Sequence, residues 1–170
     1  MTNFPLGSRE GVWRPDRFGM PYQTVKIRAS DGVETVAYWI PSQSGGRKPT
    51  VFYCHANAGN MGHRLPIVRR LKHFVDCNVF LLSYRGYGES SGTADEAGIK
   101  RDVQAGLDWL LSEAEGVDPE KLIAYGQSIG GAVAIDLVAR NAGKFAGLAV
   151  ENTFTAMRDL LPHVLPIMSW

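Results

Sequence analysis

Four segments of this chain are apolar almost without interruption, and this feature limits the possible folds more than any other. They are TVFYCH (50–55), NVFLLSY (78–84), KLIAYG (121–126) and FAGLAVE (145–151). Strands covered on both faces of a sheet need this pattern, because neither set of alternating side chains meets water. Residues 94–115 instead repeat apolar residues at helical spacing, with a charged opposite face. Strands that alternate with helices predict a mostly parallel sheet, and therefore an α/β fold.

The chain opens with a different pattern, which predicts a hairpin. Residues 24–29 (TVKIRA) and 34–40 (ETVAYWI) flank Asp31 and Gly32, a strong signal for a tight turn between antiparallel strands. With 170 residues, 45% of them hydrophobic, the chain is long enough to bury one core. We therefore expect a single domain whose sheet begins with an antiparallel pair.

The stretch LIAYGQSIGGAVA (122–134) predicts a sharp turn from strand to helix. Its Gly-x-Ser-x-Gly centre would lift Ser128 clear of the sheet, where a hydroxyl can act as a nucleophile. Gly126 and Gly130 suit such a turn, because they carry no side chain where the helix passes close to the strand. The helix that follows is apolar on nearly all sides and is expected to be buried.

A nucleophilic serine needs backbone N–H groups that stabilise the negative oxygen formed during attack. The segment HANAGN (55–60) is the candidate source, because it follows a predicted strand and is rich in small residues. In a site of this kind the donors are the N–H of Ile129, directly after the serine, and an N–H of this segment, which we place at Asn57. An ordinary polar turn is the alternative for this segment.

The segment SYRGYGESSG (83–92) ends another predicted strand and contains three glycines. It would lie at the carboxyl edge of the sheet, where open α/β sheets place their ligands. Arg85 within it either holds the loop or faces a substrate, and we favour the first role.

Four separated motifs share the order and spacing found in α/β hydrolases: HANAGN, YRGYGES followed by a long helix, GQSIGG, and ENTF (151–154). Together they resemble the bud-emergence group of that superfamily over about residues 20–165. The resemblance implies a serine hydrolase that cleaves a small acyl substrate, either an ester, a thioester or an amide. It implies Ser128 as the nucleophile, with Ile129 and Asn57 as oxyanion donors. Some relatives are attached to membranes through a segment upstream of the hydrolase domain, and nothing in this chain matches that segment.

The resemblance assigns residues 21–170 to a partial α/β-hydrolase domain, preceded by an N-terminal extension at residues 1–20. In this fold the catalytic acid and histidine follow the serine, on loops after later strands. The sequence stops at Trp170, soon after the predicted strand at 145–151. We therefore expect a chain that is truncated after the strand following the nucleophile helix and is inactive alone. A noncatalytic α/β-hydrolase-fold protein that binds a ligand or partner is the alternative.

Two further features affect the expected site. Ala56 stands where the family pattern has glycine, and if this position needs a positive φ, alanine strains the loop by roughly 1 kcal/mol or more. None of the histidines is expected to act as the base. We expect His55 to brace its loop, and His63 and His73 to be solvated. His163 lies in a region that resembles the start of a cap over the active site.

Charge and composition disfavour other classes of protein. A net charge of +1 with scattered Lys and Arg gives no support for nucleic-acid binding. No apolar run approaches the roughly 18 residues of a membrane span and no signal peptide is evident, so the chain is expected to be cytoplasmic. Cys54 and Cys77 are expected to lie too far apart for a disulfide and lack the ligand spacing of a metal site. No metal or cofactor is expected, a nucleotide-binding domain ranks far lower, and the sequence leaves the oligomeric state open.

Overall fold

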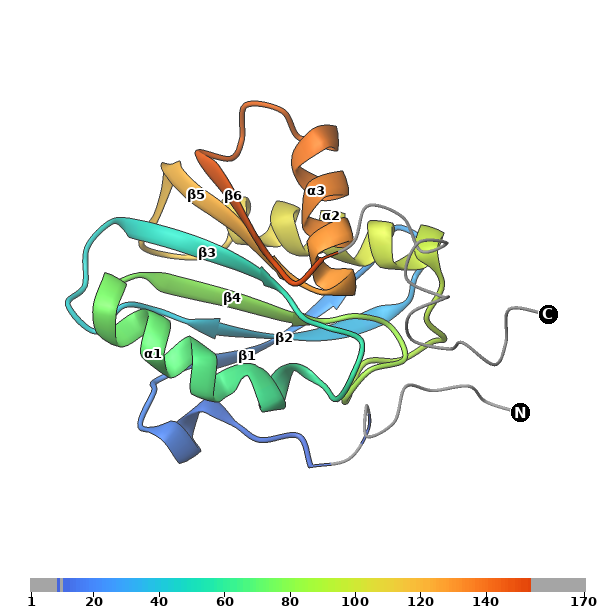
Figure 1. The fold of residues 1–170 in the computed structure, drawn as a ribbon, viewed down its shortest axis with the longest axis horizontal. Coiled ribbons are helices and arrows are strands. Elements are labelled where there is room, and N and C mark those ends of the chain that lie inside the picture. The colour runs from blue at the N-terminus through green and yellow to red at the C-terminus, as the bar shows by residue number, and fades with distance from the viewer. Residues whose placement is uncertain (1–8, 10, 154–170) are drawn as a thin grey trace.

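The computed structural model describes residue 9 and residues 11–153, which form a sheet with helices on both faces (Figure 1). The strand order is β1-β2-β4-β3-β5-β6. The strands are β1 (Gln23–Arg28), β2 (Glu34–Ile40), β3 (Lys48–Cys54), β4 (Asn78–Ser83), β5 (Val117–Gln127) and β6 (Gly147–Glu151). β2 pairs antiparallel with both β1 and β4, whereas β4, β3, β5 and β6 run parallel. The predicted α/β fold and its opening hairpin are confirmed.

Helices lie between the parallel strands, as the alternation predicts. They are the 3-10 turns η1 (Pro15–Phe18) and η2 (Met61–Arg64), and the α-helices α1 (Leu65–Val75), α2 (Glu96–Ser112) and α3 (Ile129–Arg140). α1 covers one face of the sheet, while α2 and α3 cover the other (Figure 1). The side chain of Asp95 caps α2 by accepting a hydrogen bond from the N–H of Gly98 (2.8 Å).

The core is divided between the two faces because the strands send alternate side chains to each. On the α2 and α3 face, the rings of Phe52 and Phe80 lie 5.1 Å apart and pack with Leu107 of α2. Cys54 belongs to this half of the core, whereas Cys77 belongs to the half under α1. Both thiols are buried and free, which confirms that these cysteines do not form a disulfide.

β5 begins earlier than its apolar run predicts. Val117 pairs with Lys48, and the ladder resumes at the pair of Thr50 with Leu122 after a shift in register. The residues between Val117 and Leu122 are mostly charged and are exposed or half-buried. A prediction that depends on continuous apolar residues misses such a start.

α3 is less buried than its composition predicts. Gly130, Ala134 and Leu137 are buried, but Ile135 is 44% exposed. The helix lies at the edge of the described structure beside β6, so the sheet covers only one side of it (Figure 1). For the described residues, the expectation of a helix buried on all sides is wrong.

Residues 11–20, which belong to the predicted N-terminal extension, pack onto the α1 face. Met20 is buried there, and the carbonyl of Trp13 accepts a hydrogen bond from the Tyr38 hydroxyl (3.3 Å). The ring of Trp13 also meets His63 edge to face, with centroids 5.3 Å apart. This stretch therefore shares a core with the residues that follow it.

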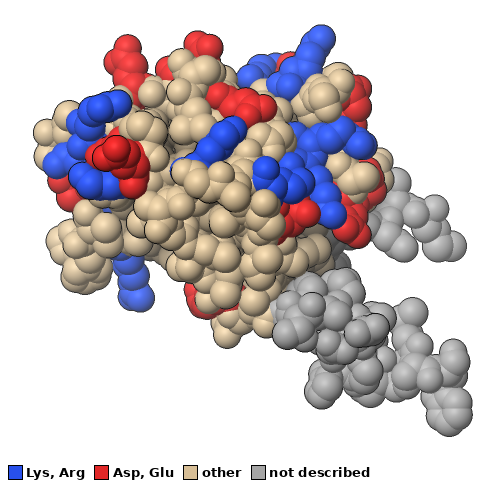
Figure 2. All heavy atoms as spheres, turned by 90° about the horizontal axis from the view of Figure 1, so that it is seen from above, with Lys and Arg blue, Asp and Glu red and all other residues tan. Residues whose placement is uncertain are grey.

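The surface mixes charges of both signs. On the face drawn in Figure 2, basic and acidic side chains lie side by side. Lys100 shows the same mixing in detail, since it pairs with Glu96 (2.8 Å) and with Asp136 (3.3 Å). Among the residues described, no helix has both the length and the apolar character needed to span a membrane.

Candidate active site

Ser128 stands at the turn between β5 and α3. Its backbone has φ +54° and ψ −121°, a conformation that costs a residue with a side chain roughly 1–3 kcal/mol. Three hydrogen bonds hold it. Its N–H donates to the carbonyl of Glu151, and its own carbonyl accepts from the N–H of Gly131 and from Thr153 Oγ1, each at 2.9 Å. This is the sharp strand-to-helix turn that the sequence predicts.

The two glycines around this turn are required by close backbone contacts. A Cβ atom on Gly126 would lie 2.2 Å from the carbonyl oxygen of Gly130. A Cβ atom on Gly130 would lie 2.1 Å from the carbonyl oxygen of Cys54. Any larger residue at either position would push α3 away from β5 or β3. The turn therefore depends on both glycines for its shape.

The segment 55–60 leaves the sheet beside this turn, because Cys54 pairs with Gly126 in neighbouring strands. His55 lies fully buried at its start. Its Nδ1 bonds to the carbonyl of Ala56 (2.8 Å), and its Nε2 accepts from the N–H of Tyr84 (3.5 Å). Burial lowers the pKa of His55 to about 4, so the ring is neutral at pH 7 and donates from Nδ1. Both ring nitrogens are therefore used inside the protein.

The bond from His55 also fixes the direction of a neighbouring N–H group. A peptide unit is planar, so holding the carbonyl of Ala56 holds the N–H of Asn57 on the opposite side of the same plane. Within the described residues, neither this N–H nor that of Ile129 donates a hydrogen bond. The N–H of Ile129 is free because it belongs to the first turn of α3, where no preceding carbonyl is available.

Two tyrosines of the loop after β4 join that loop to segment 55–60. The hydroxyl of Tyr87 donates to the side-chain oxygen of Asn57 (2.6 Å). The hydroxyl of Tyr84 donates to the carbonyl of His55 (3.1 Å), and its ring stacks on the imidazole with centroids 4.1 Å apart. Segment 55–60 is thus held by ring and hydrogen-bond contacts, which an ordinary polar turn does not need.

Arg85 holds its loop, as we favoured, and does not face an open site. It is 4% exposed and binds Asp102 of α2 through Nη2 (2.8 Å) and Asp31 of the hairpin turn through Nη1 (2.7 Å). Its backbone N–H also donates to Asp102 (2.9 Å). The Arg85 guanidinium holds the pKa of the Asp31 carboxyl well below its usual range. The loop, the hairpin and α2 are joined through this one guanidinium.

The described histidines do not contact Ser128. His55 braces its loop, as expected. His63 is half-buried and caps η2, because its Nδ1 accepts from the N–H of Asn60 (3.2 Å). The expectation that His63 is solvated is therefore wrong, whereas His73 is exposed as expected. His163 lies outside the described residues.

Ala56 does not strain the loop. It is buried, and it is absent from the described non-glycine residues that have a positive φ, which are Asp76, Ser128 and Asn152. The condition under which alanine would be unfavourable at this position is therefore not met.

A further polar group beside the turn was not predicted. The side chain of Arg64 reaches Gln127 and the carbonyl of Ala58, while Glu151 accepts from Tyr125 and from Gln127. Gln127 lies in the motif GQSIGG and Glu151 in ENTF, whereas Arg64 belongs to no motif, and the motifs do not show that these residues meet. Only the positions of Gln127 and Glu151 at the ends of neighbouring strands could have indicated that these two meet.

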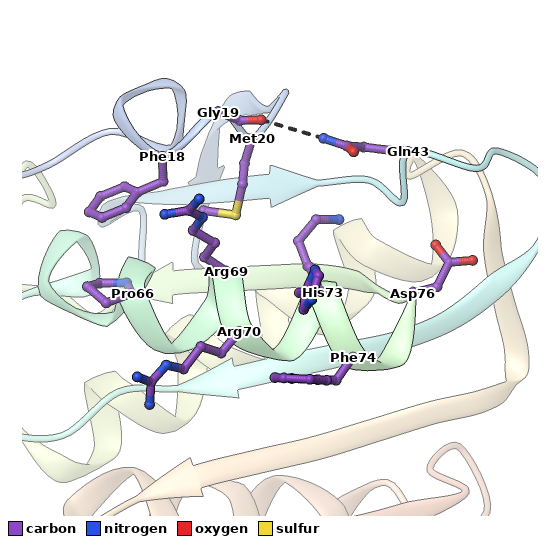
Figure 3. Close-up of a pocket in the computed structure, with 11 residues that line it drawn as sticks. Phe18, Gly19, Met20, Gln43, Pro66, Arg69, Arg70, His73, Phe74 and Asp76 are labelled. Carbon is purple, nitrogen blue, oxygen red and sulfur yellow. Dashed lines mark hydrogen bonds between the residues drawn. The ribbon is translucent and has the colours of Figure 1, made fainter.

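One cavity among the described residues lies away from Ser128. It measures about 760 Å³ and runs along α1, where Phe18, Arg69, Arg70 and Phe74 line it (Figure 3). It is an open groove, so we place the candidate site by the chemistry around Ser128 and not by volume. No group of three or more His, Cys, Asp or Glu side chains in the described residues is arranged to hold a metal ion.

A sheet in this order, with a strained serine between a parallel strand and the helix that follows it, defines the class of α/β hydrolases. The family model described as "alpha/beta hydrolase fold" matches residues 49–170, and the chain belongs to this family. It is 48% identical to the protein bem46 of Schizosaccharomyces pombe over 96% of its own length and 54% of that protein. It is 40% identical to the α/β hydrolase domain-containing protein WAV2 of Arabidopsis thaliana, over 92% of this chain and 50% of WAV2.

Solved structures agree with this assignment of the fold. The esterase Pf2001 of Pyrococcus furiosus superimposes with a TM-score of 0.74 and 24% identity. The match covers 90% of this chain and 56% of that one. The chain therefore spans about half the length of the proteins that it matches.

Proposed function

We propose that this chain carries the nucleophile and the oxyanion donors of a serine hydrolase that acts on acyl esters, thioesters or amides. The observation that carries the proposal is the backbone of Ser128, which is held at φ +54° by hydrogen bonds from three directions. Such strain persists where surrounding structure imposes it, and it gathers at catalytic positions. Membership of the α/β hydrolases supports the same class of reaction.

The proposed reaction begins when Ser128 Oγ attacks the acyl carbon and its proton passes to a general base. The carbonyl oxygen becomes an anion, which the N–H groups of Ile129 and Asn57 stabilise. Collapse of this intermediate re-forms the carbonyl and leaves an acyl-serine, while the expelled alcohol, thiol or amine takes the proton from the base. Water then repeats the attack and frees the acid. Ser128, Ile129 and Asn57 therefore account for the nucleophile and the oxyanion site.

The base and its acid partner are not among the groups described. His55 uses both ring nitrogens elsewhere, and His63 and His73 contact other groups. We propose that these two catalytic residues lie outside the described residues. The activity and substrate of the whole protein are accordingly part of the proposal. Its location stays a prediction: cytoplasmic, with membrane attachment in some relatives.

A fluorophosphonate probe tests the proposal without knowledge of the substrate. In a chain completed with the region that supplies the base and its acid partner, we expect the probe to label Ser128, as located by mass spectrometry. Ser128→Ala should abolish labelling, while Ser112→Ala, at an exposed serine of α2, should leave it unchanged. A folded completed chain that stays unlabelled would contradict the proposal and favour a noncatalytic binding protein.

A further inference from the structure

The guanidinium of Arg64 spans the gap between segment 55–60 and the turn at Ser128. Its Nη1 donates to the side-chain oxygen of Gln127 (3.2 Å), and its Nη2 donates to the carbonyl of Ala58. Gln127 comes directly before Ser128, and Ala58 directly after Asn57. One planar group therefore binds the residue before Ser128 and the residue after Asn57.

The contact on the Gln127 side continues to the end of β6. Gln127 Nε2 donates to Glu151 Oε1 (3.5 Å), and the backbone carbonyl of Glu151 accepts from the N–H of Ser128 (2.9 Å). Arg64 is thus linked through one side chain to the residue that holds the backbone of Ser128. These hydrogen bonds connect segment 55–60 with the strained turn at Ser128.

Stability alone does not account for this arginine. Among the described residues, its Nε is buried and has no hydrogen-bond partner. A buried donor without a partner is unfavourable, and such groups are rare in folded proteins. An arginine kept in this position despite an unpaired donor points to a role for the two bonds that it does make.

We propose that Arg64 is a positioning residue that sets the distance between the two oxyanion donors, the N–H of Asn57 and the N–H of Ile129. This inference rests on the proposed function. Arg64 fixes the loop on the C-terminal side of Asn57, and His55 fixes it on the N-terminal side. A bidentate guanidinium can hold two acceptors in one plane, which an ammonium group cannot do.

The test compares Arg64→Met with Arg70→Met, which removes the same charge at an exposed position of α1. Backbone ¹⁵N order parameters report on the loop without any reaction. In Arg64→Met we expect the values at residues 57–59 to fall from about 0.85 to below about 0.6, with no change in Arg70→Met. Order parameters that match wild type in Arg64→Met would overturn the inference.

Labelling by the fluorophosphonate, in the chain completed with the base and its acid partner, gives a second measurement. We expect the limiting rate of labelling in Arg64→Met to fall about tenfold or more, while the concentration of probe that gives half that rate stays the same. If only the probe concentration that gives half the limiting rate changes, Arg64 acts in probe binding, and this result would overturn the inference. The double variant with Gln127→Met and Arg64→Met should lose a smaller factor in the limiting rate of labelling than the product of the two single losses. The reason is that both substitutions remove the same hydrogen bond.

Arg64→Lys covers the case in which Arg64→Met does not fold. Lysine keeps the charge but cannot hold both acceptors, so it should reproduce the loss of order and of rate. Wild-type behaviour in Arg64→Lys would overturn the inference. Failure of the two proposals can be told apart. An unlabelled completed chain that has the wild-type sequence at Arg64 and Ser128 refutes the proposed nucleophile, and the order parameters then decide the role of Arg64 alone.

Discussion

At Ser128 the backbone and the side chain make opposite demands. A φ of +54° favours glycine, which has no Cβ to collide with the backbone, but glycine has no hydroxyl. The neighbouring Gly126 and Gly130 show that this part of the chain does use glycine where space requires it. Keeping serine between them sacrifices stability for a hydroxyl at the turn.

The cost of that choice can be measured by replacing the serine. Ser128→Gly should raise the free energy of unfolding relative to Ser128→Ala by about 1 kcal/mol, because only glycine relieves the strain. Urea denaturation of both variants provides the comparison. Equal stability of the two would mean that the turn does not strain the backbone.

His55 should make the stability of the protein depend on pH. Burial lowers its pKa to about 4 from an ordinary value of 6.5, so between these values the unfolded chain binds the proton more readily. The free energy of unfolding should therefore fall as the pH drops through this range, by roughly 1.4 kcal/mol per pH unit, and this contribution should level off below the folded pKa. Urea denaturation at several pH values measures the slope.

The matched variant is His55→Gln, which keeps a side-chain donor but does not titrate. Its stability should fall less steeply over the same pH range, even though it is lower overall because the ring contacts with Tyr84 are lost. The same slope in both proteins would assign the pH dependence to another group.

Among elements, α2 is joined to the loop after β4 by Arg85. Gly98 of α2 makes the contact possible, since a Cβ atom there would lie 2.5 Å from the Arg85 side chain. Gly98→Ala should therefore destabilise the protein by about 2 kcal/mol or more, although alanine favours a helix by about 1 kcal/mol over glycine. The displaced guanidinium would lose contacts with the fully buried Asp102.

Thermal and urea denaturation test this prediction, with Gly147→Ala as the control. Gly147 lies in β6, and a Cβ atom there would meet nothing within 4 Å. We expect that control to be neutral or slightly stabilising. If Gly98→Ala is also neutral, the helix can move aside and the buried ion pair tolerates the shift.

Sequence patterns predicted the elements better than the contacts between them. Continuous apolar runs located the four parallel strands, although not the start of β5, and the Asp31–Gly32 signal located the hairpin of β1 and β2. The Gly-x-Ser-x-Gly pattern located the turn at Ser128, because these patterns follow from local backbone rules. The meeting of Arg64, Gln127 and Glu151 was not predictable, since each lies on a separate segment and its role depends on the register of the sheet. Burial of α3 was overestimated for a related reason, because composition does not show how many sides an element presents to its neighbours.

At the scale of the whole fold, β6 is the exposed feature of the described residues with the clearest consequence. It lies at one end of the strand order, where Leu148 and Val150 are 42% and 45% exposed. An apolar edge strand favours pairing with other chains. We expect the 170-residue chain to bind a hydrophobic dye or to associate at micromolar concentration, as measured by fluorescence and light scattering.

Leu148→Lys should reduce dye binding and association, because a charge on an edge strand opposes pairing. Lys144→Arg, which keeps the charge at an exposed position near β6, is the control. A monodisperse wild-type chain that binds no dye would show that this edge is covered in solution.

The position of β3 between β4 and β5 bears on the order in which the chain assembles. Phe52 of β3 pairs with Phe80 on one side and with Ala124 on the other, so its second neighbour is far along the chain. The β1–β2 hairpin needs only a short loop and can close within microseconds, whereas pairing of distant segments is slow. During synthesis, at about 5–20 residues per second, β3 waits several seconds for β5 to appear. The turn at Ser128 waits longer, because the carbonyl of Glu151 that holds it is made later still. Ser128, with its positive φ, is therefore fixed in place only after strands β1 to β5 have been synthesised.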